Sequence, residues 1–187
     1  MLASRNAHKA RELEVLLPGW TIEPLDVEGW PDEDGKTYYE NARAKARFGR
    51  DIGDGSTWTI GEDSGLEVHA IDGRPGLHSA RYAPEGAPAI ARLLDELDGV
   101  SDRRARFVSE LVALAPDGRE VRGSGILEGR IADAASGVAG FGYDPVFIPD
   151  GEERTVAELG DGWKAEHSHR ARAARALREA VDGLGAL

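Results

Sequence analysis

Two strand-like segments joined by a tight turn constrain the fold more than any other part of this sequence. Residues 106–115 and 119–131 lie on either side of Pro116-Asp117-Gly118. An Asp-Gly pair between two such segments is a strong β-hairpin signal, because both residues accept the backbone conformations that a tight turn needs. The sequence therefore predicts a long hairpin between residues 106 and 131.

Segments of helical and of strand character mix throughout the rest of the chain. Helical spacing predicts helices over 7–17, 37–49 and 89–97, and a closing helix over 165–184 that is entered through Ser168. Strands are expected over 1–3, 20–25, 57–60, 66–71 and 143–148, and residues 61–65 end the third of them. Because strand and helix do not alternate regularly, we expect an α/β or α+β fold and not a plain doubly wound one.

The length and composition fit a single globular domain. The chain has 187 residues, of which 41% are hydrophobic and 30% charged, so it can bury a substantial apolar core. No linker stands out. We expect one domain over 1–187, consisting of two lobes that share a cleft. No apolar run approaches the ~20 residues that span a membrane, and residues 1–9 lack the apolar core of a signal peptide. We therefore expect a cytoplasmic protein with no membrane partner.

The charged residues restrict the chemistry. There is no cysteine, which excludes disulfides, thiolate nucleophiles and Cys-ligated zinc. The 34 acidic residues against five histidines favour a hard cation such as Mg²⁺ for any metal site. The net charge of −11 argues against non-specific nucleic-acid binding, which needs a broad basic face. A small phosphorylated ligand remains compatible with this charge if a few basic side chains converge.

A first candidate cluster lies between the first strand and the first helix. The N-terminus of a helix offers unpaired N–H groups and a partial positive charge, which suit a phosphate. A hydroxyl, an amide and a lysine ammonium could add contacts to it. The alternative is an ordinary helix cap by Asn6 beside an exposed lysine. The cluster comprises Ser4, Arg5, Asn6, Ala7, His8 and Lys9.

A second cluster is acidic. Glu40 lies on a predicted helix, and Glu62 and Asp63 follow a predicted strand. Mg²⁺ bound to a triphosphate takes one or two protein carboxylates and keeps several waters. A carboxylate beside the metal can also act as the general base for an attacking water. The alternatives are a solvated helix charge for Glu40 and ordinary turn chemistry for the Glu62-Asp63 pair.

Two further clusters lie in the last third of the chain. Glycines flank the aromatic residue in Gly140-Phe141-Gly142-Tyr143-Asp144-Pro145, so a flat ligand could approach and stack there, while Asp144 could accept from a base N–H. Lys164 and the sequence Ser168-His169-Arg170 place cations at a helix start, where an anionic ligand would offset their unfavourable interaction with the helix dipole. The alternatives are a tight turn packed by aromatic rings and a tolerated surface placement.

Six stretches in this order resemble the inosine triphosphate pyrophosphatase family, and the resemblance runs from Leu2 to the final helix. Each stretch alone is a weak signal, but six in register make a chance resemblance untenable. The stretches are Ser4-x-Asn6-x-x-Lys9, Glu40-Asn41-Ala42 with Lys45-Ala46, Asp63-Ser64-Gly65-Leu66, Pro75-Gly76 with Ser79-Ala80-Arg81-Tyr82, residues 140–145, and Lys164 with Ser168-His169-Arg170.

The resemblance implies a fold and a set of site residues. The fold would be a two-lobed, elongated α/β structure around a long mixed β-sheet, with a central substrate cleft and usually a homodimer. Residues 4–9 would hold the triphosphate, Glu40 and Asp63 would bind Mg²⁺, Asp63 would be the general base, and Ser64 would touch the nucleotide. The residues that would enclose the base and sugar-phosphate are Phe141, Gly142, Tyr143, Asp144, Lys164, His169 and Arg170.

The implied activity is hydrolysis of deaminated purine nucleoside triphosphates (ITP, dITP, XTP) to the monophosphate and pyrophosphate, which cleanses the nucleotide pool. The alternatives are the same chemistry on another modified or pyrimidine triphosphate, a nucleotide-binding sensor without catalysis, and an acidic protein-interaction module. The chain also departs from the family pattern. Glu62 replaces a common aspartate, the stretch 84–91 is short, and His167 stands where an apolar residue is common.

Overall fold

A computed structural model describes residues 1–4 and 6–184 of the chain. Its internal contacts divide the chain into two compact units. Unit 1 contains Met1–Asp63, Ser109–Gly125 and the C-terminal segment from His169; unit 2 contains Ser64–Val108 and Ile126–Ser168. The chain passes from one unit to the other within β2, β3 and β4, the strands over 59–68, 104–114 and 120–131, and once more between Ser168 and His169.

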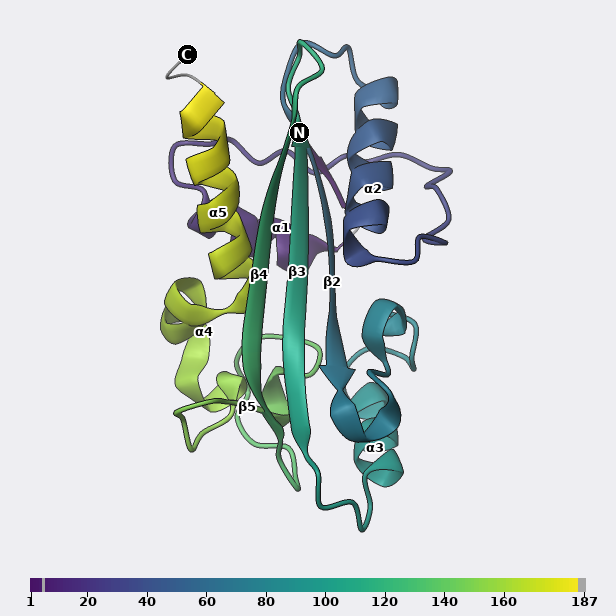
Figure 1. Ribbon diagram of the computed structural model, residues 1–187, viewed down its shortest axis with the longest axis vertical. Helices are drawn as coiled ribbons and strands as arrows, with labels where there is room; N and C mark the ends of the chain where they lie inside the picture. The colour runs from purple at the N-terminus through teal and green to yellow at the C-terminus, as the bar shows by residue number, and fades with distance from the viewer. Residues whose placement is uncertain (5, 185–187) are drawn as a thin grey trace. The chain divides into compact units, whose positions relative to one another are not determined.

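Five strands form one sheet in the order β1-β2-β3-β4-β5 (Figure 1). β1 runs parallel to β2, with Leu2 opposite Ile60, and β4 runs antiparallel to β5, with Arg130 opposite Ile148. The expected α/β class with a mixed sheet is therefore confirmed. The strands are β1 (Leu2–Ala3), β2 (Thr59–Val68), β3 (Arg104–Leu114), β4 (Glu120–Ile131) and β5 (Phe147–Pro149).

The predicted hairpin is β3 and β4. The amide of Ala115 donates to the carbonyl oxygen of Arg119 at 2.8 Å, and the amide of Gly118 donates back to that of Ala115 at 2.9 Å. Gly118 has a φ of 90°, a left-handed conformation that glycine adopts without steric cost. The Asp-Gly signal thus located the turn correctly.

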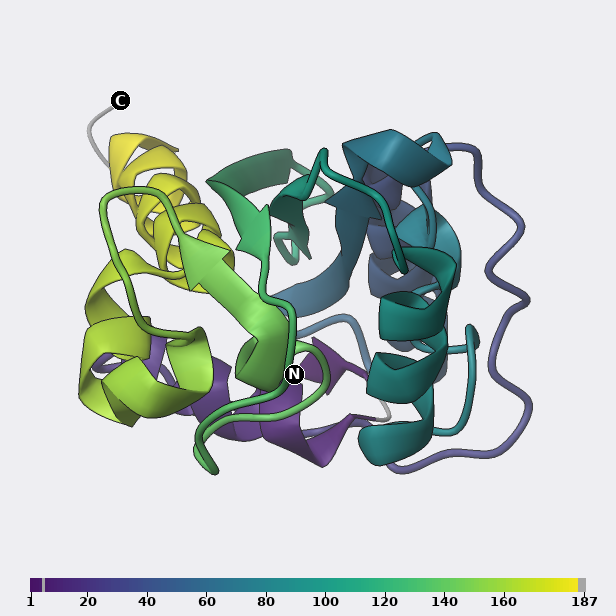
Figure 2. The same cartoon turned by 90° about the horizontal axis from the view of Figure 1, so that it is seen from below.

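Each unit has its own helices and core (Figures 1 and 2). Unit 1 carries α1 (Ala7–Leu16), α2 (Tyr38–Ile52) and α5 (His169–Leu184), and Leu13, Leu111 and Leu177 are among its fully buried core residues. Unit 2 carries α3 (Ala87–Glu96) and α4 (Val156–His167), together with 3-10 turns at His69–Ile71, Gly76–His78 and Asp144–Val146. Its core is centred on the rings of Phe107 and Phe147, whose centroids lie 4.5 Å apart.

Glycines on the strands let two helices of unit 1 approach the sheet closely. A Cβ on Gly61 would lie 2.0 Å from the carbonyl oxygen of Ala42 on α2. On β4, a Cβ on Gly125 would lie 2.0 Å from the carbonyl oxygen of His169 on α5. Backbone atoms cannot move aside as flexible side chains can, so both helix positions depend on the missing methyl groups.

Three sequence predictions were wrong. Residues 61–65 do not form a turn, because β2 runs unbroken from Thr59 to Val68 and replaces the two short strands predicted over 57–60 and 66–71. Packing outweighs the turn preference of Asp-Ser-Gly here. Gly61 lies in close contact with α2, and the Glu62 and Asp63 side chains are buried among charged partners. Residues 20–25 make only an isolated parallel bridge from Leu2 to Pro24, in which Glu23 accepts from the amide of Leu2 and the amide of Leu25 donates to the carbonyl oxygen of Leu2, each at 2.8 Å.

The C-terminal region also differs from its prediction. The closing helix begins at His169 and not at 165, because Ser168 has extended backbone angles and separates α5 from α4. The sequence did not predict the first two turns of α4, which start at a capping box between Thr155 and Glu158. Gly160, with a φ of 83°, interrupts this helix. The strand predicted over 143–148 is correct only at its end, because Asp144–Val146 form a 3-10 turn and β5 begins at Phe147.

Replacement of Gly61 by alanine tests the close packing of β2 against α2. Because the new methyl group would meet backbone atoms of α2, we expect the free energy of unfolding to fall by about 1–3 kcal/mol or more. Gly183 on α5 is the matched control, because a Cβ there meets nothing within 4 Å. Urea denaturation of both variants measures the difference, and a Gly61→Ala protein as stable as the Gly183→Ala protein would contradict the packing argument.

Candidate active site

Asn6 caps the N-terminus of α1, as the alternative interpretation of this cluster predicts, and the role of the cluster in phosphate binding stays a prediction. The side-chain oxygen of Asn6 accepts from the amides of His8 at 2.9 Å and Lys9 at 3.2 Å, and the Ser4 hydroxyl accepts from the amide of Asn6 at 3.2 Å. Ala7 and His8 are exposed, whereas Lys9 is half-buried. Arg5, predicted to contact the triphosphate, lies outside the described residues.

A cavity of about 730 Å³ opens beside this helix start within unit 1. Ser4, Asn6 and Ala7 line one side of it, and residues 24–30 line another. A volume of this size is typical of small-molecule sites, which usually measure roughly 300–1,000 Å³. Three of the predicted phosphate-binding residues therefore border a space that can admit a ligand, whereas Lys9 is not among the residues that line it.

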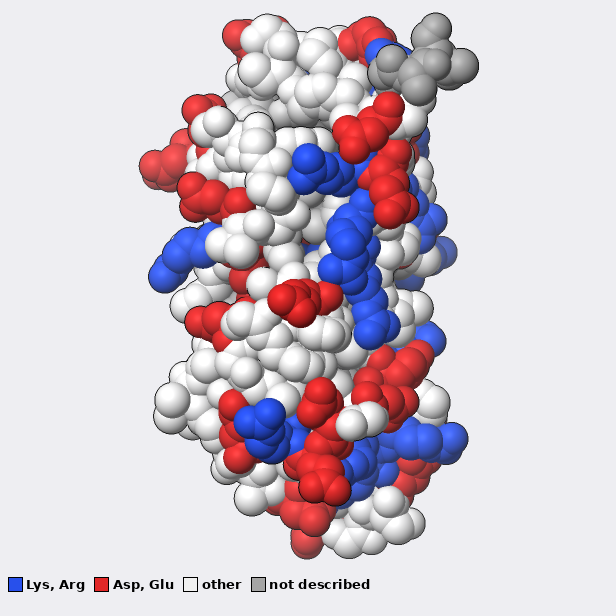
Figure 3. Space-filling model, turned by 90° about the vertical axis from the view of Figure 1, so that its left-hand side faces the viewer, with Lys and Arg blue, Asp and Glu red and all other residues white. Residues whose placement is uncertain are grey.

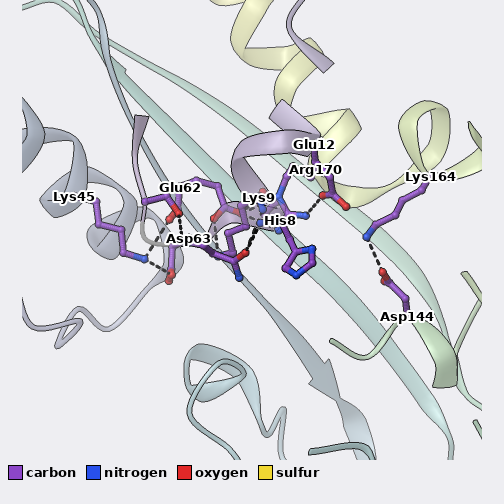
Figure 4. A network of polar contacts seen from close by, with 12 residues as sticks. His8, Lys9, Glu12, Lys45, Glu62, Asp63, Asp144, Lys164 and Arg170 are labelled. Atoms are coloured by element: carbon purple, nitrogen blue, oxygen red, sulfur yellow. Dashed lines mark hydrogen bonds and ion pairs between the residues drawn. The ribbon is translucent and has the colours of Figure 1, made fainter. Parts of the chain in front are cut away.

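Lys9 points from α1 to a buried carboxylate on β2 (Figure 4). Its ammonium lies 2.6 Å from Glu62 Oε2, and the Glu62 side chain is fully buried. The other oxygen, Oε1, accepts from Arg170 Nε at 3.2 Å and Nη2 at 3.1 Å and from the hydroxyl of Ser109 at 3.3 Å. One carboxylate thus joins two cations that come from α1 and α5.

The cations keep Glu62 ionised. Burial disfavours the charged carboxylate, but the attraction of Lys9 and Arg170 outweighs it and holds the pKa of Glu62 far below its usual value. Arg170 is itself buried, and its other face pairs with Glu12 on α1. Burial favours its neutral form, yet the two carboxylates raise the pKa of Arg170. The chain Lys9–Glu62–Arg170–Glu12 is therefore a closed set of alternating charges.

Asp63, the predicted general base, has different partners. Its Oδ1 lies 2.8 Å from the ammonium of Lys45, and its Oδ2 accepts from the amide of Asn41 at 3.1 Å; both partners lie on α2. Burial raises the pKa of Asp63, and Lys45 opposes this shift only in part. A carboxyl with a raised pKa suits proton transfer near neutral pH better than an ordinary aspartate does.

Glu33 is a site residue that the sequence reading missed. Its carboxylate lies 2.5 Å from the same Lys45 ammonium that binds Asp63. Burial would lower the pKa of Lys45, but Asp63 and Glu33 outweigh it and raise this pKa. Glu33 lies in the acidic segment 26–35, where nothing in the local sequence distinguishes it from its neighbours. Lys45 belongs to one of the six family-like stretches, but the sequence alone assigns it no role.

Glu40, the other predicted Mg²⁺ ligand, is exposed at the start of α2. Its carboxylate accepts from the amide of Lys36 at 2.6 Å, as a capping residue does. Its role in metal binding stays a prediction. Among the described residues, no three His, Asp or Glu side chains are grouped as a ready-made metal site. A cation held by Asp63 or Glu40 would thus take most of its ligands from water or phosphate, as Mg²⁺ does.

Unit 2 contains most of the predicted base-binding residues, whereas His169 and Arg170 belong to unit 1. Asp144 Oδ2 accepts from the ammonium of Lys164 at 2.6 Å and from the amide of Phe141 at 2.8 Å (Figure 4). The ammonium also lies 4.3 Å from the centroid of the Phe141 ring. A Cβ on Gly140 would lie 2.1 Å from Asp144 Oδ2, so a glycine is required there. These contacts fix the loop that presents the Phe141 ring.

The remaining predicted residues occupy defined places in their own units. In unit 2, the Tyr143 hydroxyl donates to the carbonyl oxygen of Ser79 at 3.2 Å, burial raises the pKa of Tyr143, and Gly142 has a φ of 60° with open space around it. Ser64 is half-buried on β2. In unit 1, His169 is buried at the first position of α5.

The exposed charges are mixed in sign. Figure 3 shows acidic and basic groups interspersed over one face of the molecule. Arg172 and Arg175 are exposed on α5, which therefore carries basic groups despite the net charge of −11. Among the described residues, the structure contains no helix with the length and apolar character that crossing a membrane requires.

The sequence comparison decides the family. The pattern of the Ham1 family matches residues 1–180, almost the whole chain. The chain belongs to the Ham1 family. A curated Ham1-type relative from Deinococcus deserti, named dITP/XTP pyrophosphatase, is 42% identical over 98% of this chain and 90% of its own length. A relative of the same name from Bdellovibrio bacteriovorus is 45% identical over 79% of this chain and 76% of its own.

Solved structures of Ham1 proteins share the fold. The Ham1 protein of Staphylococcus aureus superimposes with a TM-score of 0.85 at 35% identity, covering 98% of this chain and 97% of its own. A nucleoside-triphosphatase / dITP/XTP pyrophosphatase from Mycobacterium abscessus gives a TM-score of 0.72 at 39% identity, covering 94% of this chain and 96% of its own. The family resemblance read from the six sequence stretches is thus confirmed.

Removal of the Arg170 guanidinium tests the buried ion-pair chain. Arg170→Met would remove the guanidinium that pairs with Glu12 and would leave the buried Glu62 with Lys9 in place of two cations. Removing one partner of a buried ion pair typically costs about 3–5 kcal/mol of unfolding free energy. Arg172, two residues further along α5 and exposed, is the control, because surface changes stay within about 0.5 kcal/mol. Denaturant titration of Arg170→Met and Arg172→Ala measures both values. Equal stabilities of the two variants would show that the ion pairs of Arg170 do not stabilise the fold.

Proposed function

We propose that the chain is a Mg²⁺-dependent nucleoside triphosphate pyrophosphatase that hydrolyses ITP, dITP and XTP to the monophosphate and pyrophosphate. The observation that carries this proposal is the helix start of α1, with Lys9, set beside two adjacent buried carboxylates on β2, of which Asp63 has a raised pKa. The dITP/XTP pyrophosphatase relatives at about 40% identity support the substrate class.

Residues of unit 1 bind the phosphates in this proposal. The first turn of α1, in which Asn6 caps the amides of His8 and Lys9, contacts the phosphate oxygens together with the Ser4 hydroxyl and the Lys9 ammonium. The helix dipole favours the negative charge there. Arg5 adds to this set as the sequence motif predicts. The cavity beside Ser4 and Asn6 supplies room for the triphosphate.

The balance of charge in unit 1 fits a divalent cation. Three cations, Lys9, Lys45 and Arg170, face four carboxylates, those of Glu12, Glu33, Glu62 and Asp63. A triphosphate gains little attraction from a group with excess negative charge, so it needs a cation of its own. Mg²⁺ held by Asp63 and Glu40 would supply this charge and stabilise the negative charge that develops on the leaving pyrophosphate.

Asp63 acts on the attacking water. Its carboxylate orients the water and accepts a proton while the water oxygen bonds to the α-phosphorus. The bond from that phosphorus to the bridging oxygen of the β-phosphate breaks, and pyrophosphate leaves. Lys45 and Asn41 hold the two Asp63 oxygens, which fixes the direction in which the base acts. Ser64, the next residue on β2, contacts the nucleotide.

The predicted base-binding residues select the base. The Phe141 ring stacks on the purine, Gly142 and Tyr143 line it, and donors among Lys164, His169 and Arg170 favour the 6-oxo group of hypoxanthine and xanthine. An amino group at that position would leave a site donor unpaired, which is an effective basis for rejecting adenine. Family resemblance further supports a homodimer in the cytoplasm.

A substrate panel tests the activity. With Mg²⁺ present, we expect ITP, dITP and XTP to be turned over far faster than ATP or GTP, with pyrophosphate and the monophosphate as products. Separate enzyme-coupled assays for pyrophosphate and orthophosphate identify the bond that is cleaved. Equal rates with ITP and ATP would contradict the base selection, and release of orthophosphate alone would contradict the chemistry.

Asp63→Asn tests the general base. The amide keeps the size of the side chain and its contact with Asn41 but cannot accept the proton, so kcat for ITP should fall by roughly 10²–10⁴. Glu179→Gln, an exposed change on α5, should keep wild-type turnover. Circular dichroism confirms that both variants are folded, and an Asp63→Asn enzyme with full kcat would exclude Asp63 as the base.

Asp144→Asn tests how the unit 2 loop selects the base. Loss of the charge weakens the hold on Lys164 and Phe141, so the ratio of kcat/KM for ITP to that for ATP should fall by roughly tenfold or more. Steady-state kinetics with both nucleotides measure this ratio. A ratio equal to that of the wild type would show that the Asp144–Lys164 pair is structural only.

A further inference from the structure

Glu62 is a buried carboxylate for which the proposed mechanism has no use. It is adjacent to Asp63 on β2, but its partners differ from those of Asp63. Its two oxygens contact Lys9, Arg170 and Ser109. It therefore faces α1 and α5, whereas Asp63 faces α2.

Glu62 fixes the position of Lys9. Lys9 lies in the first turn of α1, near the exposed end of the helix. Without the contact to Glu62, its long, flexible side chain could sample many rotamers. The 2.6 Å contact holds its ammonium on the buried Oε2. The carboxylate itself cannot turn, because Arg170 and Ser109 hold Oε1. A single geometry for the ammonium follows from these three contacts.

The same contact limits how strongly Lys9 attracts a phosphate. A negative charge beside the ammonium cancels much of its field at the distance of a bound ligand. Without Glu62, the other six charged side chains of unit 1 named above would be balanced, with three cations and three anions. Glu62 thus makes the group net negative, and a polyphosphate then binds well only with a cation of its own.

We propose that Glu62 is a positioning residue that holds Lys9 for the reaction and, through its charge, makes polyphosphate binding depend on the divalent cation. This inference rests on the proposed function for the reaction, but its binding part concerns only polyphosphate and unit 1. It assigns no metal contact to Glu62.

The decisive measurement is binding of inorganic tripolyphosphate in the presence of EDTA, by calorimetry, with the full-length chain. In Glu62→Gln, the lost negative charge should lower the metal-free Kd roughly threefold to tenfold. In the same variant kcat for ITP with Mg²⁺ should fall roughly tenfold to a hundredfold, because Lys9 is no longer held. A purely structural role of Glu62 would not tighten tripolyphosphate binding while lowering kcat. Weaker or unchanged tripolyphosphate binding would overturn the proposal.

Glu62→Asp separates charge from position. This variant keeps the negative charge but is one methylene shorter, so the metal-free Kd should stay within roughly twofold of the wild type while kcat falls, since the reach to Lys9 is lost. An aspartate variant with full kcat would overturn the positioning role. If Glu62→Gln does not fold, this variant carries the test of positioning by itself.

Glu110→Gln is the matched control. Glu110 is a buried carboxylate on β3 of the same unit, where Arg122 donates to both its oxygens at 2.7 Å and Ser124 donates at 2.8 Å. Its loss should lower stability and leave tripolyphosphate affinity and kcat unchanged. An equal gain in affinity for this variant would show a general charge effect and overturn the specific role of Glu62.

Two further measurements distinguish this inference from a metal-binding role of Glu62 and from the proposed function. The Mg²⁺ concentration for half-maximal rate should be the same, within roughly twofold, in Glu62→Gln and the wild type, and a large increase would make Glu62 a metal ligand and overturn the proposal. If the wild type releases no pyrophosphate from any nucleotide, the proposed function fails. The tripolyphosphate measurement then still decides the role of Glu62, because it needs no turnover.

Discussion

One buried carboxylate organises unit 1. Glu62 on β2 is fully enclosed, and it is stable there only because Lys9 and Arg170 bring two cations to it from α1 and α5. Each cation is in turn tied to a specific helix position, so the charge pairs specify where both helices lie. The N-terminus of α1, which offers its amides to a ligand, is thereby held in register with β2.

Close packing makes this charge arrangement possible. The contacts are short because the helices approach the strands at glycines, Gly61 beneath α2 and Gly125 beneath α5. A larger residue at either position would lift the helix and lengthen the ion pairs that the helix contributes, and Coulomb attraction in a poorly solvated site weakens with each added ångström. Apolar packing and ion pairing thus depend on the same backbone approach, and neither one alone sets the geometry.

Local patterns in the sequence predicted much of this fold and only part of the site. The Asp-Gly turn, the helix over residues 38–52 and the Asn6 cap are decided by neighbours in sequence, and all three were found. The strand character of residues 61–65 could not be found this way, because Gly61 is selected by contact with α2 and not by its own turn preference. Glu12 and Glu33 were missed for the same reason, since their partners Arg170 and Lys45 come from other elements.

The pairing of Lys45 with two carboxylates has a consequence for the order of events at the site. In the structure without ligand, Glu33 and Asp63 share one ammonium, which reduces the repulsion between these two anions. In the proposed mechanism Lys45 keeps its contact with Asp63, and Mg²⁺ held by Asp63 would add a second positive neighbour to this carboxylate. Each of the two carboxylates would then have a cation beside it throughout the reaction, so no buried charge would be left unpaired.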